Sequence, residues 1–364
     1  MISNLQLENF KCFEKLNIDL KNVNVLTGIN GMGKSTVIQS LLLLEQSKVK
    51  NNEKAGLYLK GSYINLGNSQ DVVYDKAQDD TVEIMYTTTD GEQNQSVFSF
   101  KQDMDYLPLQ YSINAGRDDI YKHFVYISAY RIKPQETYTV INEEELAEKR
   151  FGNNGEFALQ YLSIYGDESV KNKSVIEPYV NVGGDSLFNQ TRLWMDRVSP
   201  GVSPKIKVMM ETRSSELNFD FVEGRERSNS YKSINVGFGI TYVLPVVVAL
   251  LAAEDGDIII IENPEAHIHP AGQRMLGELI ARAGAGGVQV IVETHSEHVV
   301  NGIRIAVKNK MISKDKVQVD FFYKDNEAGY KHTYKSLHIS ENGKMSSWPQ
   351  GFLDEWENSL MELL

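Results

Sequence analysis

Residues 28–35 have the spacing of a phosphate-binding loop of the Walker A type. They read Gly-Ile-Asn-Gly-Met-Gly-Lys-Ser, after an apolar strand-like segment and before an apolar helix-like one. Gly28, Gly31 and Gly33 allow the backbone to curl so that several N–H groups face one anion. A helix that starts here adds its positive N-terminal end. Strand, glycine-rich loop and helix in this order predict a nucleotide phosphate site.

The polar side chains of this loop have distinct expected roles. Lys34 would bind the β- and γ-phosphates, the Ser35 hydroxyl would ligate Mg²⁺, and Thr36 would contact the α-phosphate side. The nucleotide-binding residues expected from the loop are Asn30, Gly31, Met32, Gly33, Lys34, Ser35 and Thr36.

A second group of polar residues follows the apolar run Ile258-Ile-Ile-Ile. Glu262 ends that run, and a carboxylate at a strand end facing a phosphate loop suits Mg²⁺ held through water. Capping of the next turn is the simpler explanation. Glu265, His267 and His269 follow closely, but no third and fourth ligand at the usual spacing supports a zinc site.

Two further segments carry candidate site residues. The apolar run Val290-Ile-Val-Glu ends in Thr294-His295, and a histidine at a strand tip can sense a γ-phosphate. Gly237 and Gly239 precede an apolar helix, so that their turn can present backbone N–H groups to an anion. The alternatives are a histidine bonded to backbone and a plain helix-entry turn.

The elements that must position these residues follow from periodicity and turn residues. Expected strands cover residues 5–10, 16–20, 23–26, 257–262 and 288–294, and residues 50–130 are rich in strands. Expected helices cover residues 35–47, 143–163, 185–198, 243–253 and 273–283, with a loop at 199–204. The order strand, helix, strand over 257–294 is typical of an α/β nucleotide-binding core.

Composition limits the class of protein. The chain has 364 residues, 41% hydrophobic and 24% charged, with a net charge of −12, which fits one or two globular domains. Cys12 is the single cysteine, which excludes a disulfide framework and favours the reducing cytoplasm. No signal peptide is expected, because residues 1–8 have no basic segment followed by an apolar run, and no membrane span is expected, because the apolar run 243–253 is too short.

The order of these motifs resembles the ABC-type ATPases of the Rad50, SMC, RecF and OLD group. Leu5-Gln-Leu-Glu-Asn-Phe-Lys-Cys-Phe is similar to their N-terminal opening, whose basic residue, here Lys11, reaches the nucleotide. One bacterial branch, with a small C-terminal domain of unknown function, is more similar still. The similar segments are 126–131, 235–245, 261–270, 293–298 and 346–354.

The resemblance implies an α/β fold: an ABC-type P-loop ATPase head with a mixed sheet and an α+β insert between Walker A and the signature-like turn. Its segments would be the N-terminal lobe 1–70, the insert 71–230, the C-terminal lobe 231–310 and a C-terminal subdomain 311–364. It implies ATP and Mg²⁺ as ligands. It also places Gln70 at the position of a Q-loop, where it would approach Mg²⁺.

Two departures from the family pattern affect the expected catalysis. Asn263 stands where most relatives have a glutamate, and an amide cannot act as a general base. Either Glu265 orients the attacking water, or hydrolysis is slow and ATP acts as a switch. The signature-like turn reads Asn235-Val-Gly-Phe-Gly, so Asn235 or Ser233 must replace the usual serine hydroxyl. The expected catalytic residues are Glu262, Asn263, Glu265 and His295.

The leading functional hypothesis is a cytoplasmic ATPase whose two copies sandwich ATP, with Gly237, Gly239 and Asn235 completing the partner's site. Related ATPases work with nucleases in anti-phage systems such as Septu, Gabija and PARIS, which implies a separately encoded effector and a defence role.

The alternative is a RecF-like, DNA-binding repair ATPase. A modest basic cluster would then face DNA, namely Arg304, Lys308, Lys310, Lys314 and Lys316. A transporter subunit ranks last, and no membrane partner is expected.

Overall fold

The computed structural model describes residues 1–50, 55–114, 121–149, 151–177, 184–223, 226–325, 331–349, 351–352 and 355–363. The chain divides into two compact units. The first unit consists of Met1–Tyr121, Gln318–Leu337 and Ser347–Leu364. The second unit consists of Lys122–Val317 and His338–Ser346.

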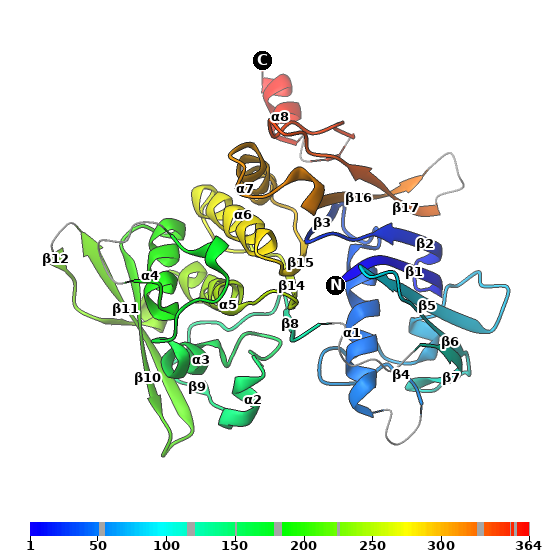
Figure 1. Cartoon of the computed structure of the whole chain (residues 1–364), viewed down its shortest axis with the longest axis horizontal. Coiled ribbons are helices and arrows are strands. Elements are labelled where there is room, and N and C mark those ends of the chain that lie inside the picture. Colours follow the sequence, from blue (N-terminus) through cyan, green and yellow to red (C-terminus); the bar gives the residue numbers. More distant parts are fainter. Residues whose placement is uncertain are drawn as a thin grey trace. The chain divides into compact units, whose positions relative to one another are not determined.

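The first unit contains an antiparallel sheet with the strand order β2-β1-β5-β6-β7-β4 (Figure 1). Its strands are β1 (Ile2–Phe10), β2 (Phe13–Asp19), β4 (Gly56–Tyr58), β5 (Thr81–Thr88), β6 (Gln93–Ser99) and β7 (Tyr106–Ile113). Leu5 and Leu7 of β1 are buried, whereas Gln6 between them is only half-buried. This alternation puts one face of β1 in the core, as a period of two requires.

A second group of strands in the first unit surrounds the phosphate loop. Strand β3 (Val23–Gly28) is buried along its whole length and leads through the loop into helix α1 (Lys34–Lys50). Beside β3 lies β16 (Val317–Asp325), which pairs antiparallel with β17 (Lys331–Leu337). The unit also contains the 3₁₀ turn η1 (Ser69–Asp71) and the C-terminal helix α8 (Glu355–Leu363).

The core of the second unit is a parallel arrangement of three strands. Strand β14 (Ile258–Glu262) lies between β8 (Phe124–Ile127) and β15 (Gln289–Glu293), with Ile258 opposite Phe124 and Gln289. The four isoleucines of β14 are fully buried. A strand buried on both faces needs a continuous apolar run, and this explains why Ile258-Ile-Ile-Ile shows no alternation.

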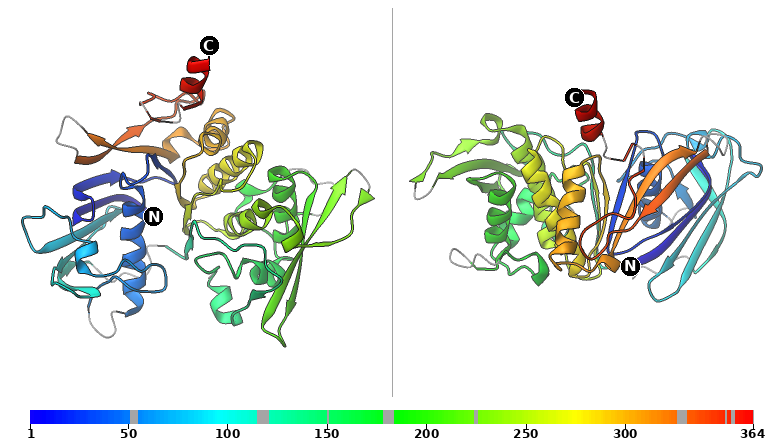
Figure 2. Two further views of the ribbon diagram at one scale, coloured as in Figure 1. Left: turned by 180° about the vertical axis from the view of Figure 1, so that it is seen from behind. Right: turned by 90° about the horizontal axis from the view of Figure 1, so that it is seen from above.

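Helices cover this parallel group. Helix α5 (Phe238–Ala252) is apolar on all sides and buried from Thr241 to Leu251. Helices α6 (Pro270–Ala285) and α7 (Glu297–Lys308) lie side by side in both views of Figure 2 and pack closely at two glycines. A Cβ on Gly277 would lie 2.1 Å from the Val299 carbonyl oxygen, and one on Gly302 would lie 2.2 Å from that of Arg274.

The rest of the second unit is built from short helices and a small sheet. The helical pieces are α2 (Glu143–Ala147), α3 (Ala158–Tyr165), η2 (Lys173–Val175), α4 (Leu187–Val198), η3 (Ser233–Asn235) and η4 (Lys314–Lys316). The strands are β9 (Tyr138–Thr139), β10 (Val202–Met209), β11 (Ser214–Glu223), β12 (Glu226–Arg227) and β13 (Tyr231–Lys232).

Two sequence-based expectations for this region were wrong. The single helix expected over 143–163 is two helices, since Gly152 and Gly155 between them have φ angles of +76° and +72°. These left-handed positions cannot continue an α-helix. Arg150, inside that range, lies outside the described residues. The loop expected at 199–204 ends early because β10 begins at Val202; Pro204 is tolerated there since β10 lies at the edge of its sheet.

Two remaining expectations concern membrane spans and the C-terminal segment. Among the described residues, no helix is both long enough and apolar enough to span a bilayer. Of the family-like segment 346–354, Gln350, Leu353 and Asp354 lie outside the described residues. In its described part, Phe352 is fully buried and packs against Trp348 and Phe321.

Candidate functional site

The phosphate loop in the first unit has the backbone that its glycines predict. Gly28, Gly31 and Gly33 have φ angles of +132°, +76° and +109°. A Cβ on Gly28 would lie 2.2 Å from the Phe322 carbonyl oxygen, and one on Gly33 would lie 2.4 Å from the Phe13 ring. Gly31 has no heavy atom within 4 Å of a built Cβ. Two of the glycines are therefore required by packing as well as by backbone conformation.

The lysine of the loop folds back over it. The Lys34 ammonium donates hydrogen bonds of 2.9 Å to the carbonyl oxygens of Gly28 and Ile29, and its side chain is buried. Ser35 is half-buried at the start of α1, and Asn30 at the loop tip is exposed. A cation and a helix N-terminus at one curled loop form an arrangement that binds phosphate.

The remaining loop residues, Met32 and Thr36, lie on either side of Lys34 in the sequence. Met32 is half-buried, and Thr36 is buried, with its Oγ1 3.5 Å from the Cys12 Sγ. The Thr36 N–H donates to the Gly33 carbonyl oxygen at 3.1 Å, which closes the first turn of the helix. The loop therefore rests on the turn that contains Cys12.

That turn also holds Lys11. Lys11 has a φ angle of +52°, and its ammonium donates to the Gln39 Oε1 of α1 at 2.8 Å. Burial lowers the pKa of Lys11, while the neighbouring Cys12 and Asp71 oppose that shift. The structure thus places this cation beside the first helix of the nucleotide loop.

His332 of β17 was not among the sequence-based candidates, yet it lies beside the phosphate loop. Burial and the nearby Lys324 lower its pKa, and hydrogen bonding to the backbone of Gly31 and Cys12 opposes that shift. Its ring also packs edge-on against Phe13, with centroids 6.4 Å apart. No sequence signal pointed to it, because it is about 300 residues from the loop and belongs to no recognised motif.

Gln70, the expected Q-loop residue, is exposed in η1. Its Nε2 donates to the Asp103 Oδ1 at 2.6 Å. The neighbouring Ser69 hydroxyl donates to the Lys101 carbonyl oxygen at 2.7 Å and anchors the turn. The contacts of Gln70 are therefore with the β6–β7 connection.

In the second unit, Glu262 is half-buried at the end of β14. Its Oε2 accepts a hydrogen bond from the Ala129 N–H at 3.2 Å, and its carboxylate interacts with the Tyr126 hydroxyl. Burial raises the pKa of Glu262, and the bonds from Ala129 and Tyr126 and the charge of Arg131 oppose this only in part. A carboxylate in this position has an incomplete set of counter-charges.

Arg131 is a second residue at this site whose role no sequence motif indicates. Its Nη1 donates to the Glu262 carbonyl oxygen at 2.6 Å and to that of Ser128 at 3.2 Å, and its Nη2 donates to that of Asn263. Its guanidinium lies 4.3 Å from the centroid of the Tyr242 ring. Arg131 therefore fixes the backbone of the β14 tip. The sequence 126–131 resembled the family, but the resemblance did not show this function.

Asn263 has a φ angle of +46°. Its N–H donates to the Glu293 carbonyl oxygen at 2.8 Å, which joins the tips of β14 and β15. Asparagine tolerates the left-handed region better than glutamate does. Local backbone conformation thus gives a physical reason for asparagine at this position.

Glu265 connects the two strand tips. Its Oε2 accepts from the Thr294 hydroxyl and its Oε1 from the His295 N–H, both at 2.8 Å. The side chain of His295 is exposed. Both carboxylate oxygens of Glu265 thus hold the turn that carries His295, so its observed contacts are those of a positioning residue.

The two other histidines of this segment have structural contacts. His267, with a φ angle of +63°, packs against the rings of Phe238 and Tyr242, with centroids 4.7 and 5.4 Å away. His269 caps α6, because its Nδ1 accepts from the Ala271 N–H at 3.3 Å. Within the described residues, no group of three or more His, Cys, Asp or Glu side chains could hold a metal ion.

In the signature-like turn, the two glycines differ. A Cβ on Gly239 would lie 2.0 Å from the His267 carbonyl oxygen, so internal packing requires this glycine. Gly237 is exposed, and the atom nearest to a Cβ there is the Ile240 Cδ1 at 4.0 Å. Gly237 is the N-cap of α5, a position where glycine is favoured, and no close packing contact within the described chain requires it.

The two candidates for the missing serine hydroxyl also differ. The Ser233 hydroxyl is buried, donates to the Gln135 carbonyl oxygen at 2.8 Å and accepts from the Tyr138 hydroxyl at 3.1 Å. Asn235 is exposed. Of the pair, Asn235 is the one that an incoming group can reach.

The expected site residues thus fall into two sets. The phosphate loop, Lys11 and Gln70 belong to the first unit, whereas Glu262, Asn263, Glu265, His295 and the signature-like turn belong to the second. Within the second unit, the tips of β14 and β15 are joined by hydrogen bonds from Asn263 and Glu265. Each set is organised by its own contacts.

The chain has the fold of an SMC head, an ABC-type ATPase fold. An Smc head bound to the C-winged helix domain of ScpA matches with a TM-score of 0.50 and 12% identity, covering 93% of this chain and 98% of that one. An Smc head domain with an extended coiled coil, bound to the C-terminal domain of ScpA and derived from Pyrococcus furiosus, matches with a TM-score of 0.51 and 13% identity. That match covers 100% of this chain and 99% of the other.

Residues 23–301 match the family model described as "AAA domain, putative AbiEii toxin, Type IV TA system". The chain belongs to this family of AAA domains. Residues 312–363 match a family of unknown function, DUF3696. A search of curated proteins found no match. The resemblance and the fold class inferred from the sequence are confirmed.

Proposed function

We propose that this protein binds and hydrolyses ATP with Mg²⁺, dimerises around the nucleotide, and acts as a switch for a separately encoded effector, a nuclease, in bacterial anti-phage defence. The observation that carries the proposal is the phosphate loop. Its three glycines have positive φ angles, and Lys34 is folded over the loop at the start of α1. This geometry favours binding of a nucleotide phosphate.

The Mg²⁺ part of the proposal depends on two oxygen ligands. Ser35 at the start of α1 would bind the ion directly, and Glu262 would hold it through water, which are oxygen donors that Mg²⁺ prefers. An ion of charge +2 would also compensate the half-buried Glu262 carboxylate, whose pKa is raised by burial. Gln70 is the third proposed Mg²⁺ residue, through its Oε1, while its Nε2 donates to Asp103.

Dimerisation around ATP is supported by the surface of the signature-like turn. Gly237 is exposed without an internal packing reason. Large apolar side chains close to it in the sequence are exposed as well: Ile234 is 44% exposed and Phe238 41%. Exposed apolar groups beside an open glycine are typical of a surface that another protein covers. We therefore propose that Gly237, Gly239 and Asn235 contact the ATP held by a second copy.

The catalytic roles follow from the contacts at the strand tips. We propose that Glu262 polarises the attacking water or the metal ion, that His295 senses the γ-phosphate, and that Glu265 positions His295. Asn263 cannot accept the proton of the water, so the proposed hydrolysis is slow and ATP serves mainly to hold the closed state.

The partner and the setting rest on the family alone. The family description names a putative toxin of a toxin–antitoxin system, and the Smc heads with the same fold were solved with ScpA bound. We propose by analogy that the insert 71–230 and the C-terminal subdomain 311–364 contact the effector. Residues 1–70 and 231–310 would form the two lobes of the ATPase head. The proposed compartment is the cytoplasm, where Cys12 would stay reduced.

Sedimentation and nucleotide binding test the switch. Wild type and Glu262→Gln should form a dimer with ATP and Mg²⁺ and dissociate without them. Lys34→Ala should bind ATP weakly and stay monomeric. Gly237→Glu should fold and bind ATP but stay monomeric, because its side chain has free space in the monomer. An unchanged sedimentation coefficient in wild type and Glu262→Gln on adding ATP would refute the dimer model.

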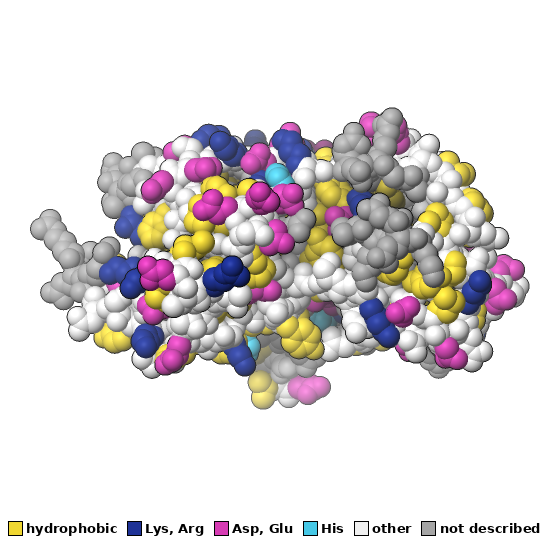
Figure 3. All heavy atoms as spheres, turned by 90° about the horizontal axis from the view of Figure 1, so that it is seen from below, with side chains coloured by type: hydrophobic (Ala, Val, Ile, Leu, Met, Phe, Trp, Pro, Cys, Tyr) yellow, Lys and Arg dark blue, Asp and Glu magenta, His cyan; other side chains and the backbone are white. Residues whose placement is uncertain are grey.

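DNA binding of the RecF kind is the alternative, carried by the basic cluster. The structure separates that cluster: Lys314 pairs with Glu341 at 3.4 Å and Lys316 donates to the Ala285 carbonyl oxygen, whereas Arg304 and Lys308 line a cavity. On the face in Figure 3, basic side chains are scattered among acidic ones. Tight, salt-sensitive DNA binding by the isolated protein would favour this alternative.

A further inference from the structure

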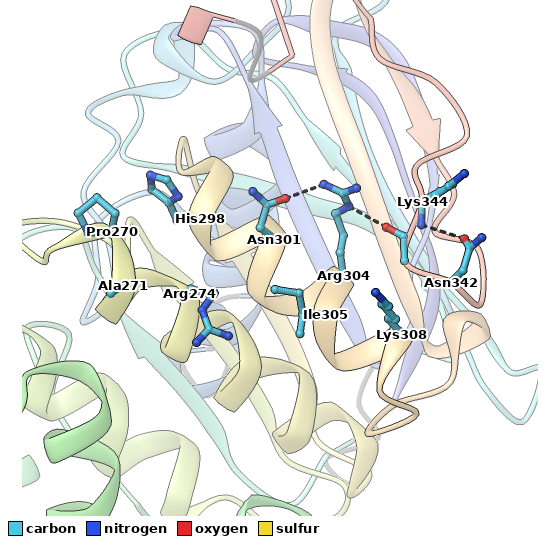
Figure 4. A pocket seen from close by; sticks show the side chains of 11 residues that line it. Pro270, Ala271, Arg274, His298, Asn301, Arg304, Ile305, Lys308, Asn342 and Lys344 are labelled. Atoms are coloured by element: carbon cyan, nitrogen blue, oxygen red, sulfur yellow. Dashed lines mark hydrogen bonds between the residues drawn. The ribbon is translucent and has the colours of Figure 1, made fainter. Parts of the chain in front are cut away.

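A basic groove lies in the second unit, within residues that the phosphate site does not use. It has a volume of about 480 Å³ and is formed by α6, α7 and the turn 340–344 (Figure 4). Its lining residues are Pro270, Ala271, Arg274, His298, Asn301, Arg304, Ile305, Lys308, Asn342, Gly343 and Lys344. The volume is that of a small-molecule site.

The charge of this groove is opposite to that of the whole chain. The lining includes two arginines, two lysines and a histidine but no carboxylate, although the net charge of the protein is −12. Among the described residues, no carboxylate lies within ion-pair distance of Arg274, Lys308 or Lys344. The nearest acidic neighbours in the sequence are Glu297, 3.6 Å from His298, and Glu341, which pairs with Lys314. In the described part of the chain, three neighbouring cations without a carboxylate in ion-pair distance, Arg274, Lys308 and Lys344, favour an anionic ligand.

The walls of the groove are fixed by close packing. The Arg274 carbonyl oxygen contacts Gly302, where any side chain would clash, so α6 holds Arg274 at a set distance from α7. On the other wall, the Arg304 Nε donates to the Gly343 carbonyl oxygen at 2.9 Å, and Gly343 has a φ angle of +78°. A Cβ on Gly343 would lie 2.8 Å from the Arg304 carbonyl oxygen. Cations held by rigid elements form a preorganised site.

The groove has two unlike ends. Figure 4 shows Pro270, Ala271 and His298 at one end and Lys308, Asn342 and Lys344 at the other, with Arg304 between them. The residues from His298 to Lys308 lie on one helix and span about 15 Å at 1.5 Å per residue. One end therefore offers apolar and ring surface, while the rest offers charge and amide groups.

We propose that this groove binds a phosphorylated small molecule with two or more phosphate charges and an uncharged ring or apolar part, such as a nucleotide. Arg304, Lys308, Lys344 and Arg274 bind the phosphates, because guanidinium and ammonium groups are the usual phosphate donors. Pro270 and His298 pack against the uncharged part. The site is distinct from the phosphate loop and does not depend on it. Its ligand contacts both α7 and the turn 340–344 in the region that matches DUF3696.

Equilibrium binding with full-length protein carrying Lys34→Ala tests the site, since this background weakens the phosphate loop. The probes are inorganic tripolyphosphate, ATP and AMP. Tripolyphosphate and ATP should bind, AMP more weakly, and Lys308→Glu or Arg274→Gln should weaken binding tenfold or more. The matched control is Lys207→Glu, an exposed charge reversal on β10 that should leave binding unchanged. Hydrogen exchange should show protection of 298–308 and 338–346 on binding.

Three outcomes would overturn the proposal. The first is that none of the three probes binds to the Lys34→Ala protein. The second is that Lys207→Glu weakens binding as much as Lys308→Glu does, which would indicate bulk charge. The third is that a single-stranded DNA oligonucleotide protects 298–308 while the small probes do not. If ATP does not bind at the phosphate loop but tripolyphosphate still binds in the groove, the proposed switch fails and the proposed groove site stands.

Discussion

The phosphate loop and the strand tips of the second unit are stabilised in different ways. In the loop, the polar contacts of Lys34 are local, with the carbonyls of Gly28 and Ile29, and the contacts with distant segments are made by glycine backbone packed against Phe322 and Phe13. At the strand tips, side-chain hydrogen bonds join distant segments: Arg131 with Glu262, and Glu265 with Thr294 and His295. The loop is therefore sensitive to backbone changes, and the tips are sensitive to loss of single side-chain partners.

Gly28→Ala should have the largest effect on stability. The new Cβ would overlap the Phe322 carbonyl oxygen at a φ angle of +132°, so unfolding free energy should fall by about 3 kcal/mol or more. Gly31→Ala is the matched control, and it should cost only about 1 kcal/mol because its Cβ meets open space. Urea denaturation measures both. Equal losses of unfolding free energy in the two variants would show that backbone conformation alone, and not contact with β16, causes the destabilisation.

Glu265→Gln should lower stability by about 1–3 kcal/mol, because one of its two hydrogen-bond donors, Thr294 or His295, would face an amide NH₂. Thermal denaturation would report this loss, and ATP hydrolysis should fall with it. Restoration of hydrolysis at low temperature, where the fold is intact, would be consistent with a positioning role. A full loss of hydrolysis with unchanged stability would instead make Glu265 the catalytic carboxylate.

Glu262→Gln should differ from Glu265→Gln in its effect on stability. Because burial raises the pKa of Glu262, its charged form is disfavoured in the folded state, and removing the charge should leave stability equal or higher. ATP hydrolysis should fall roughly 100-fold or more if Glu262 acts on the metal or the water. A steady-state phosphate-release assay with Glu265→Gln alongside separates the two roles. Unchanged hydrolysis in Glu262→Gln would remove it from the mechanism.

Asp320→Asn should have a pH-dependent effect in the first unit. Burial raises the pKa of Asp320 from 3.8 to about 6, against hydrogen bonds from Ser336 and Gln318. The folded state therefore takes up this proton at higher pH than the unfolded state, so wild-type stability should rise as pH falls from 8 through 6 and level off near 4.

At pH 8, Asp320→Asn should be more stable than wild type by about 1–3 kcal/mol, since a shift of two pKa units corresponds to about 3 kcal/mol. It should also lack that part of the pH dependence. Urea denaturation at pH 8 and pH 5 measures it, with the exposed Asp79→Asn as control. A variant that is less stable than wild type at pH 8 would show that the carboxylate charge has a counter-charge.

Local features of the sequence determined the parts of the protein that depend on neighbours in the chain. The glycines and Lys34 predicted the loop, and the all-apolar Ile258–Ile261 run predicted a strand buried on both faces, because both signals are set within a few residues. The single helix expected over 143–163 is wrong, because the local pattern does not record the break between the two helices. Periodicity continued through it, but Gly152 and Gly155 adopt left-handed conformations that composition alone does not reveal.

Only the tertiary structure decided which residues hold the strand tips and which glycines serve packing. Arg131 is 131 positions from the Glu262 carbonyl it binds, and His332 reaches the loop from a strand near the C-terminus. Gly237 and Gly239 look alike in the sequence, yet only Gly239 meets another backbone. Long-range contacts of this kind depend on how the strands and helices assemble, and no local pattern records them.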